Sequence, residues 1–131
     1  MIQRPLAAFI RLATGIRRQP ISTLPRGPVV YFANHTSHLD FLSIWAALPH
    51  ALRGMTHPVA AKDYWTKSAV RRWLASSVFQ AHLIDRTVSS TKKHPLDPLC
   101  KLLTEGRSII IFPEGTRSRD GIMNSFKPGI H

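Results

Sequence analysis

Residues 108–118, Ser-Ile-Ile-Ile-Phe-Pro-Glu-Gly-Thr-Arg-Ser, decide the fold of this chain. The run 108–112 is dominated by β-branched isoleucine, and such a short apolar run is typical of a strand buried in a parallel sheet. It stops abruptly at the polar turn 113–118. In open parallel sheets, reactive groups gather just outside the carboxyl ends of the strands. The stretch therefore predicts a buried strand with functional residues at its end.

The same pattern of strand and polar turn occurs nearer the N-terminus. Residues 29–33, Val-Val-Tyr-Phe-Ala, predict a second buried strand, and the polar cluster 34–40, Asn-His-Thr-Ser-His-Leu-Asp, follows it directly. The apolar run 41–48 then predicts a helix. Shorter strands are expected at 59–61 and 83–84. This alternation predicts an α/β fold, a single-layer and mostly parallel sheet flanked by helices.

Two further helices and one loop complete the expected chain path. Residues 49–58 are expected to form a loop. Asp63 is predicted to cap a helix that runs to Val78, with an apolar side made of Ala69, Val70, Trp73, Leu74 and Ser77. The next helix, delayed by Pro95 and Pro98, is expected to end at Gly106 and to turn three leucines toward the core, Leu99, Leu102 and Leu103.

His35 and Asp40 form the first candidate site. A histidine just past a buried strand is held rigidly, and imidazole transfers protons near neutral pH. With Asp40 in the first helical turn, its carboxylate would hold one ring nitrogen as a donor and leave the other as a base. Two other interpretations stay open. One is a metal site formed with His38, although no further ligand cluster is evident. The other is a structural cluster in which Asn34, Thr36 or Ser37 caps the helix that follows.

The turn 113–118 is the second candidate site. Gly115 permits a tight turn that exposes backbone N–H groups, while Thr116 and Arg117 add hydroxyl and guanidinium donors, as in a phosphate-binding turn. Glu114 is expected either to pair with Arg117 or to hydrogen-bond a substrate hydroxyl. The alternative is that Glu114 and Arg117 form an ordinary surface ion pair, which stabilises a protein little.

The chain is strongly basic. Its 131 residues carry 18 Lys+Arg against 7 Asp+Glu, a formal net charge of +11, which predicts attraction to phospholipid, nucleic acid or a phosphorylated substrate. Arg86, steadied by Asp85, would supply a second phosphate contact; the alternative is that Asp85 and Arg86 form an ordinary surface ion pair. The basic residues are spread along the chain without a recognition motif, so no nucleic-acid partner is expected. Cys100 is the single cysteine, which excludes an internal disulfide and a cysteine-rich zinc module.

The N-terminal segment 1–19 has an amphipathic pattern. Its apolar residues recur at helical spacing and are Leu6, Phe9, Ile10, Ala13 and Ile16, and its positive charges are Arg4, Arg11, Arg17 and Arg18. The pattern predicts a helix at the interface of an anionic bilayer. A first helix that covers the domain core fits the same pattern, and a mitochondrial presequence has a similar composition. No stretch reaches the roughly 20 apolar residues of a spanning helix.

Taken together, these motifs resemble the glycerolipid acyltransferase family, of the 1-acylglycerol-3-phosphate (lysophosphatidic acid) acyltransferase type. The first motif of that family, His-x4-Asp, is matched within 34–40, and its third, Phe-Pro-Glu-Gly-Thr-Arg-Ser, is matched in full by 112–118. The ending of its second motif is matched by 84–86, and its Phe-Lys-x-Gly element by 126–129. The resemblance covers residues 27–131.

This resemblance implies acyl transfer from acyl-CoA or acyl-carrier protein to lysophosphatidic acid, giving phosphatidic acid without a metal or a further cofactor. It implies that His35 is the general base and that Asp40 orients it. The residues it implies for binding the acceptor are Arg86, Glu114, Gly115, Thr116 and Arg117. The wording of the third motif favours lysophosphatidate over glycerol 3-phosphate, and Asp40 in place of Glu argues against the lipid A acyltransferases.

The resemblance also divides the chain into a membrane-interface helix, 1–19, and an acyltransferase domain, 28–131. It implies membrane association on the cytoplasmic face. Two departures stand out, because the glycine expected near 79–82 is replaced and the family's fourth motif does not appear before His131. The domain is therefore expected to be incomplete at its C-terminus, and this stretch alone to be poorly stable or inactive. The competing hypothesis is a noncatalytic basic membrane-surface module. A serine hydrolase is not favoured, because the sequence contains no Gly-x-Ser-x-Gly nucleophile turn.

Overall fold

Four parallel strands form one sheet in the computed structural model, which describes residues 2–17, 26–85, 96–118 and 120–127. The sheet order is β1-β4-β2-β3, and the strands are β1 (Val30–Phe32), β2 (Thr56–Ala61), β3 (His82–Ile84) and β4 (Ser108–Ile111). Tyr31 pairs with Ile110, and Pro58 also lies opposite Ile110 on the other side of β4. All three pairings are parallel, so the predicted α/β fold with one parallel sheet is confirmed.

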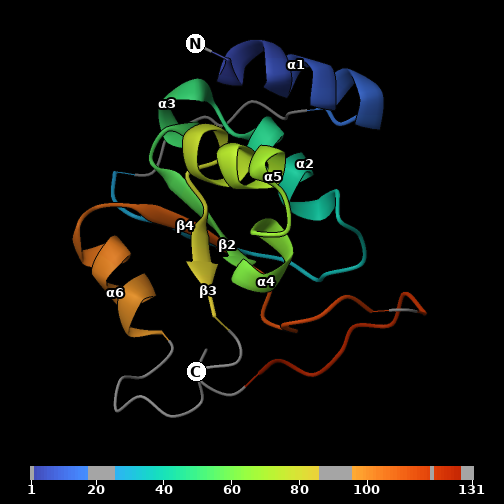
Figure 1. The fold of residues 1–131 in the computed structure, drawn as a ribbon, viewed down its shortest axis with the longest axis vertical. Helices are drawn as coiled ribbons and strands as arrows, with labels where there is room; N and C mark the ends of the chain where they lie inside the picture. The colour runs from blue at the N-terminus through green and yellow to red at the C-terminus, as the bar shows by residue number, and fades with distance from the viewer. Residues whose placement is uncertain (1, 18–25, 86–95, 119, 128–131) are drawn as a thin grey trace.

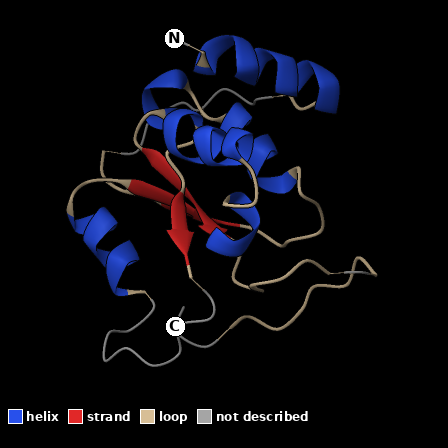
Figure 2. Ribbon diagram, in the orientation of Figure 1, coloured by secondary structure: helices blue, strands red, loops and turns tan. Residues whose placement is uncertain are grey.

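Helices connect and flank these strands (Figures 1 and 2). They are α1 (Gln3–Thr14), α2 (Asp40–Ala47), α3 (His50–Arg53), α4 (Lys62–Trp65), α5 (Ala69–Trp73), a π-helix η1 (Leu74–Val78) and α6 (Asp97–Thr104). α1 packs on α2. α6 packs on β4 and lies away from the α1–α2 pair. The sheet is therefore the layer to which both groups of helices attach.

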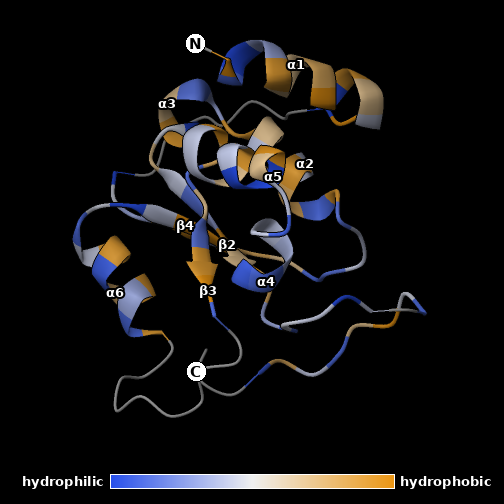
Figure 3. Cartoon of the chain, viewed as in Figure 1, coloured by the Kyte–Doolittle hydropathy of each residue, from blue (hydrophilic) through white to orange (hydrophobic). Residues whose placement is uncertain are grey.

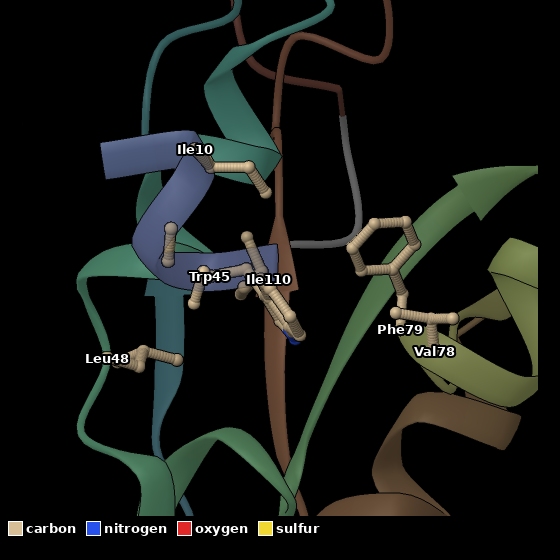
Figure 4. Close-up of a cluster of buried hydrophobic side chains, with 8 residues drawn as sticks. Ile10, Trp45, Leu48, Val78, Phe79 and Ile110 are labelled. Carbon is tan, nitrogen blue, oxygen red and sulfur yellow. The ribbon is translucent and has the colours of Figure 1, made fainter. Parts of the chain in front are cut away.

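A cluster of buried hydrophobic side chains lies between the sheet and α1, α2 and η1 (Figure 4). Trp45 is fully buried at its centre, with edge-to-face contact to Phe79 at 5.0 Å between ring centroids. Ile110 of β4 enters the same cluster, while its neighbour Ile109 is buried outside it. Successive strand residues point to opposite faces, so Ile109 faces the other side of the sheet. Both faces of β4 are thus covered.

α1 divides its apolar residues between the core and the surface (Figure 3). Ala7 and Ile10 are buried against the domain, whereas Phe9 and Leu12 are exposed. The helix therefore covers the core, as one interpretation of the sequence expected, and also presents a second apolar side. No helix in the described parts of the chain has the length and apolar character needed to cross a membrane.

The predicted single helix from Asp63 to Val78 is wrong. α4 ends at Trp65, and the Ser68 hydroxyl accepts the backbone N–H of Arg71 at 3.2 Å, which begins α5 as a new helix. After Trp73 the helix widens, and the Phe79 N–H donates to the Leu74 carbonyl at 2.9 Å. Each break changes the helical phase, so the predicted apolar side is wrong except at Leu74, which packs partly buried against the core cluster.

The burial of this segment shows the change of phase. Val70 and Trp73, both expected in the core, are 67% and 50% exposed. Ala75 and Val78, which lie within the widened helix η1, are buried instead. The wider helix rotates the chain so that these residues, rather than Val70 and Trp73 before them, meet the core.

The predicted loop 49–58 is also wrong, because it contains α3 and the start of β2. Arg53, buried at the end of α3, donates hydrogen bonds to the carbonyls of Trp45, Ala46 and Leu48. These are carbonyls at the end of α2 that lack partners within the helix. A buried cation thus orders a connection that the sequence pattern did not mark.

Candidate active site

The two polar clusters meet at one edge of the sheet. β1 and β4 are parallel neighbours, so the turns that follow them lie at the same edge, as the sequence predicted. The Ser118 N–H donates to the His35 carbonyl at 2.8 Å and ties one turn to the other. The His35 ring stacks on Phe112, the residue just after β4, with centroids 4.3 Å apart. The fold therefore brings together residues far apart in the sequence.

His35 and Asp40 form a hydrogen-bonded pair. The His35 Nδ1 atom lies 2.9 Å from Asp40 Oδ2, and the same oxygen accepts the backbone N–H groups of Thr36 at 2.7 Å and Ser37 at 2.8 Å. Burial alone would raise the pKa of Asp40, but the hydrogen bonds from Ser37, His35 and Thr36 outweigh it and hold the pKa below its ordinary value. Asp40 is therefore an ionised, acceptor-only partner.

This ionised partner fixes the tautomer of His35. Because the Asp40 carboxylate can only accept, Nδ1 of His35 carries the proton that it donates. The second ring nitrogen, Nε2, is then left with its lone pair. The local sequence produces this arrangement simply, since Asp40 is the first residue of α2 and the 36–37 backbone turns back toward it. The arrangement is suited to proton abstraction by Nε2.

Glu114 connects the two turns from inside the protein. Its side chain is only 1% exposed, and Oε1 accepts the backbone N–H of His35 at 2.7 Å. Oε2 accepts both the backbone N–H of Asn124 at 2.9 Å and its side-chain amide at 3.0 Å. The hydrogen bonds from Asn124 and His35 lower the pKa of Glu114. Both oxygens thus accept hydrogen bonds from His35 and Asn124 rather than from Arg117.

The other predicted binding residues lie on the surface of the turn. Gly115, Thr116 and Arg117 are exposed. Gly115 has φ +69°, and a Cβ placed there would lie 3.2 Å from the Cγ and Cε atoms of Lys127. The position therefore requires glycine for its backbone conformation and for the close approach of Lys127. Arg86, the remaining predicted binding residue, lies outside the described residues.

Sequence reasoning did not assign the supporting roles of three residues at this site. Asn124 binds Glu114, Ser118 ties down the His35 backbone, and Phe112 stacks on the His35 ring. Phe112 and Ser118 lie within the matched motif 112–118, whereas Asn124 carried no signal. Within the described ranges, no group of three or more His, Cys, Asp or Glu side chains is arranged to hold a metal ion.

A parallel sheet with these motifs at its carboxyl edge defines the class of protein, and the chain belongs to the acyltransferase family. The model of that family, described as Acyltransferase, matches residues 15–131. No solved structure matches the chain.

Curated relatives give this family match a narrower context. The chain is 35% identical over 108 residues to the Homo sapiens protein named 1-acyl-sn-glycerol-3-phosphate acyltransferase alpha, covering 80% of this chain and 35% of that protein. It is 31% identical over 102 residues to the chloroplastic 1-acyl-sn-glycerol-3-phosphate acyltransferase LPAT1 of Arabidopsis thaliana, covering 78% and 27% of the two chains. The chain thus spans about a third of the length of the curated relatives it matches.

Proposed function

We propose that this protein transfers an acyl group from a thioester to the free hydroxyl of lysophosphatidic acid, giving phosphatidic acid. The observation that carries the proposal is the 2.9 Å hydrogen bond between His35 Nδ1 and Asp40 Oδ2 at the carboxyl edge of the sheet. Membership of the acyltransferase family and the names of the relatives support the reaction and its acceptor.

The proposed reaction uses His35 as a proton carrier. Nε2 takes the proton of the acceptor hydroxyl while the hydroxyl oxygen forms a bond to the thioester carbonyl carbon. The tetrahedral intermediate collapses with cleavage of the C–S bond, and the leaving thiolate takes the proton back from Nε2. Asp40 stabilises the imidazolium that exists between these two transfers. The donor is acyl-CoA or acyl-carrier protein, which acts as co-substrate, and no metal or further cofactor takes part.

The acceptor is proposed to bind at the exposed turn beside this pair. Gly115, whose N–H donates to the Phe112 carbonyl at 3.0 Å, shapes the turn. Thr116 and Arg117 offer side-chain donors for the phosphate and glycerol portions. Arg86 is proposed to contribute a second phosphate contact. The buried position of Glu114 supports a positioning role, in which it holds the His35 turn against the acceptor turn.

The proposed site of action is an anionic membrane surface on the cytoplasmic face. Two exposed apolar residues of α1, Phe9 and Leu12, support this, with Arg4 and Arg11 on the same helix. An apolar side with basic residues is the pattern of a helix that rests in the interface of an anionic leaflet.

The decisive experiment measures transfer of a labelled acyl group into lysophosphatidic acid presented in vesicles that contain anionic lipid. His35→Ala is expected to remove turnover, whereas His50→Ala, an exposed histidine at the start of α3, keeps the wild-type rate. Full activity in His35→Ala would disprove the base assignment. Salt-sensitive vesicle binding without turnover, both in this chain and in a C-terminally extended one, would favour the noncatalytic membrane-surface module instead.

A further inference from the structure

A stack of three side chains stands beside the His35 turn. The rings of His38 and Tyr64 are stacked with centroids 5.1 Å apart, and the Arg71 guanidinium carbon lies 4.5 Å from the centroid of the Tyr64 ring. The three residues come from the turn before α2, from α4 and from α5. The break between α4 and α5 makes this stack possible, because it lets Arg71 turn back onto the residue at position 64.

The stack holds Arg71 in a defined place. Arg71 is half-buried, whereas its neighbour Arg72 is exposed and makes only a long hydrogen bond of 3.4 Å to the Thr66 carbonyl. A guanidinium that lies flat on an aromatic ring keeps the N–H donors at its edge available for a ligand. Ordering it in the unliganded protein reduces the entropy that binding would otherwise cost.

The positive charge around this stack is not neutralised. Within the described residues neither Arg71 nor Arg117 forms an ion pair. Both guanidinium groups act on the same imidazole, since burial first and then Arg117, His35 and Arg71 lower the pKa of His38. The nearby carboxylate, Asp40, already binds His35 and two backbone N–H groups. The stack therefore places one cation, Arg71, beside the turn that carries the proposed base, and an anion is its natural ligand.

We propose that Arg71, placed over the Tyr64 ring, forms a phosphate-binding subsite beside the His35 turn. The inference rests on the proposed acyl transfer and extends it, because Arg71 belongs to none of the family-like motifs. The ligand is a phosphate monoester, whose oxygens match the paired N–H donors of a guanidinium. Both substrates of the proposed reaction have this chemistry, as the head group of lysophosphatidic acid and as the 3′-phosphate of coenzyme A.

Kinetics with matched variants test the role of Arg71. Arg71→Gln is expected to raise KM for the phosphate-bearing substrate about tenfold or more, the loss expected for one charge-assisted hydrogen bond. Arg72→Gln, the control at the next residue, keeps the wild-type KM. Tyr64→Leu should weaken binding because it removes the ring under Arg71, and the conservative Tyr64→Phe should restore it. A rise for lysophosphatidic acid assigns the subsite to the acceptor, whereas a rise for acyl-CoA but not for acyl-pantetheine assigns it to the donor.

A binding measurement separates this inference from the proposed function. The guanidinium N–H signal of Arg71 in the NMR spectrum of the unaltered chain is followed during titration with glycerol 3-phosphate and, separately, with coenzyme A. A saturable shift with either probe that exceeds the shift of Arg72 supports the subsite, even if no acyl transfer occurs. If neither probe shifts Arg71 more than Arg72, the subsite is overturned, whatever the turnover. This measurement needs no variant, so it decides the matter even where Arg71→Gln does not fold.

Discussion

Glu114 Oε1 accepts the backbone N–H of His35 at 2.7 Å, across 79 residues of sequence. The other oxygen of the same carboxylate accepts two hydrogen bonds from Asn124. One buried side chain therefore joins the turn that carries the proposed base to the turn that is proposed to bind the acceptor. The relative position of base and acceptor depends on this carboxylate, although it binds the backbone of His35 and not its ring.

Glu114→Gln is expected to lower kcat about tenfold or more while changing KM less. The carboxylate accepts three hydrogen bonds, and an amide nitrogen in place of one oxygen would face a donor and move the His35 turn. Steady-state kinetics check this. Glu105→Gln, an exposed glutamate of a surface pair with Lys101, is the matched control and should behave as wild type. A wild-type kcat in Glu114→Gln would contradict the positioning role.

Asp40→Asn is expected to lower kcat by roughly 100-fold or more with little change in KM, as for residues that orient a base. An asparagine oxygen can still accept from His35, Thr36 and Ser37, so the local geometry is largely kept. The negative charge that stabilises the imidazolium is lost. The control is Asp97→Asn in α6, far along the chain, with circular dichroism to verify folding of both variants. If Asp40→Asn loses helical signal and its lower kcat is explained by that loss of folded protein, Asp40 has a structural role instead.

The sequence predicted the strands and both polar turns of the site because these depend on local chemistry. β-branched runs mark buried strands, and residues 108–112 and 29–33 lie within one or two residues of β4 and β1. Parallel pairing then places the two turns at one edge. The approach of His35 to Asp40 follows from a spacing of five residues and needs no distant partner.

Features that depend on tertiary contacts could not be predicted in this way. The segment 63–78 has helical periodicity throughout, yet the Ser68 cap and the widened turn at η1 divide it. The role of Glu114 depends on Asn124 and on a backbone N–H, and neither carries a sequence signal. An acidic side chain near Arg117 in the sequence suggested an ion pair. The Glu114 side chain is instead buried and accepts hydrogen bonds from His35 and Asn124.

The free energy of unfolding is expected to fall as the pH drops through the acid range. Asp40 and Glu114 have folded-state pKa values below their ordinary values of 3.8 and 4.5, so the unfolded chain binds more protons there. The stability that these carboxylates contribute is present above those ordinary values and is lost as the pH falls through the lower, folded-state pKa values. Urea unfolding at a series of pH values measures it. In the double variant Asp40→Asn/Glu114→Gln, the free energy of unfolding should fall less steeply between about pH 5 and about pH 3, the range in which carboxylates titrate. An unchanged slope of the free energy of unfolding against pH would contradict the assignment.

Gly115→Ala should impair acceptor binding, whereas Gly121→Ala should not. Both glycines have positive φ, +69° and +77°, so alanine at either costs about 1–2 kcal/mol of stability. Only at position 115 would the new methyl group press on the Lys127 side chain, because the space around Gly121 is open. Equilibrium unfolding should therefore give similar losses, while KM for lysophosphatidic acid rises in Gly115→Ala alone. An equal KM in both variants would remove the 115–117 turn from the proposed acceptor site.

Substitutions on the two sides of α1 should affect folding and membrane attachment separately. Ile10 is 8% exposed and belongs to the core, whereas Leu12, two residues further, is 85% exposed. Ile10→Ala is expected to lower the free energy of unfolding by about 2–4 kcal/mol, the usual cost of truncating a buried isoleucine. Leu12→Ala should change it by less than about 0.5 kcal/mol, as at most surface sites, yet weaken binding to anionic vesicles several-fold because less apolar area enters the interface. Chemical unfolding and vesicle co-sedimentation measure the two effects. Since α1 covers the core with one side only, vesicle binding of Leu12→Ala at the wild-type level would show that its other side does not rest on the membrane.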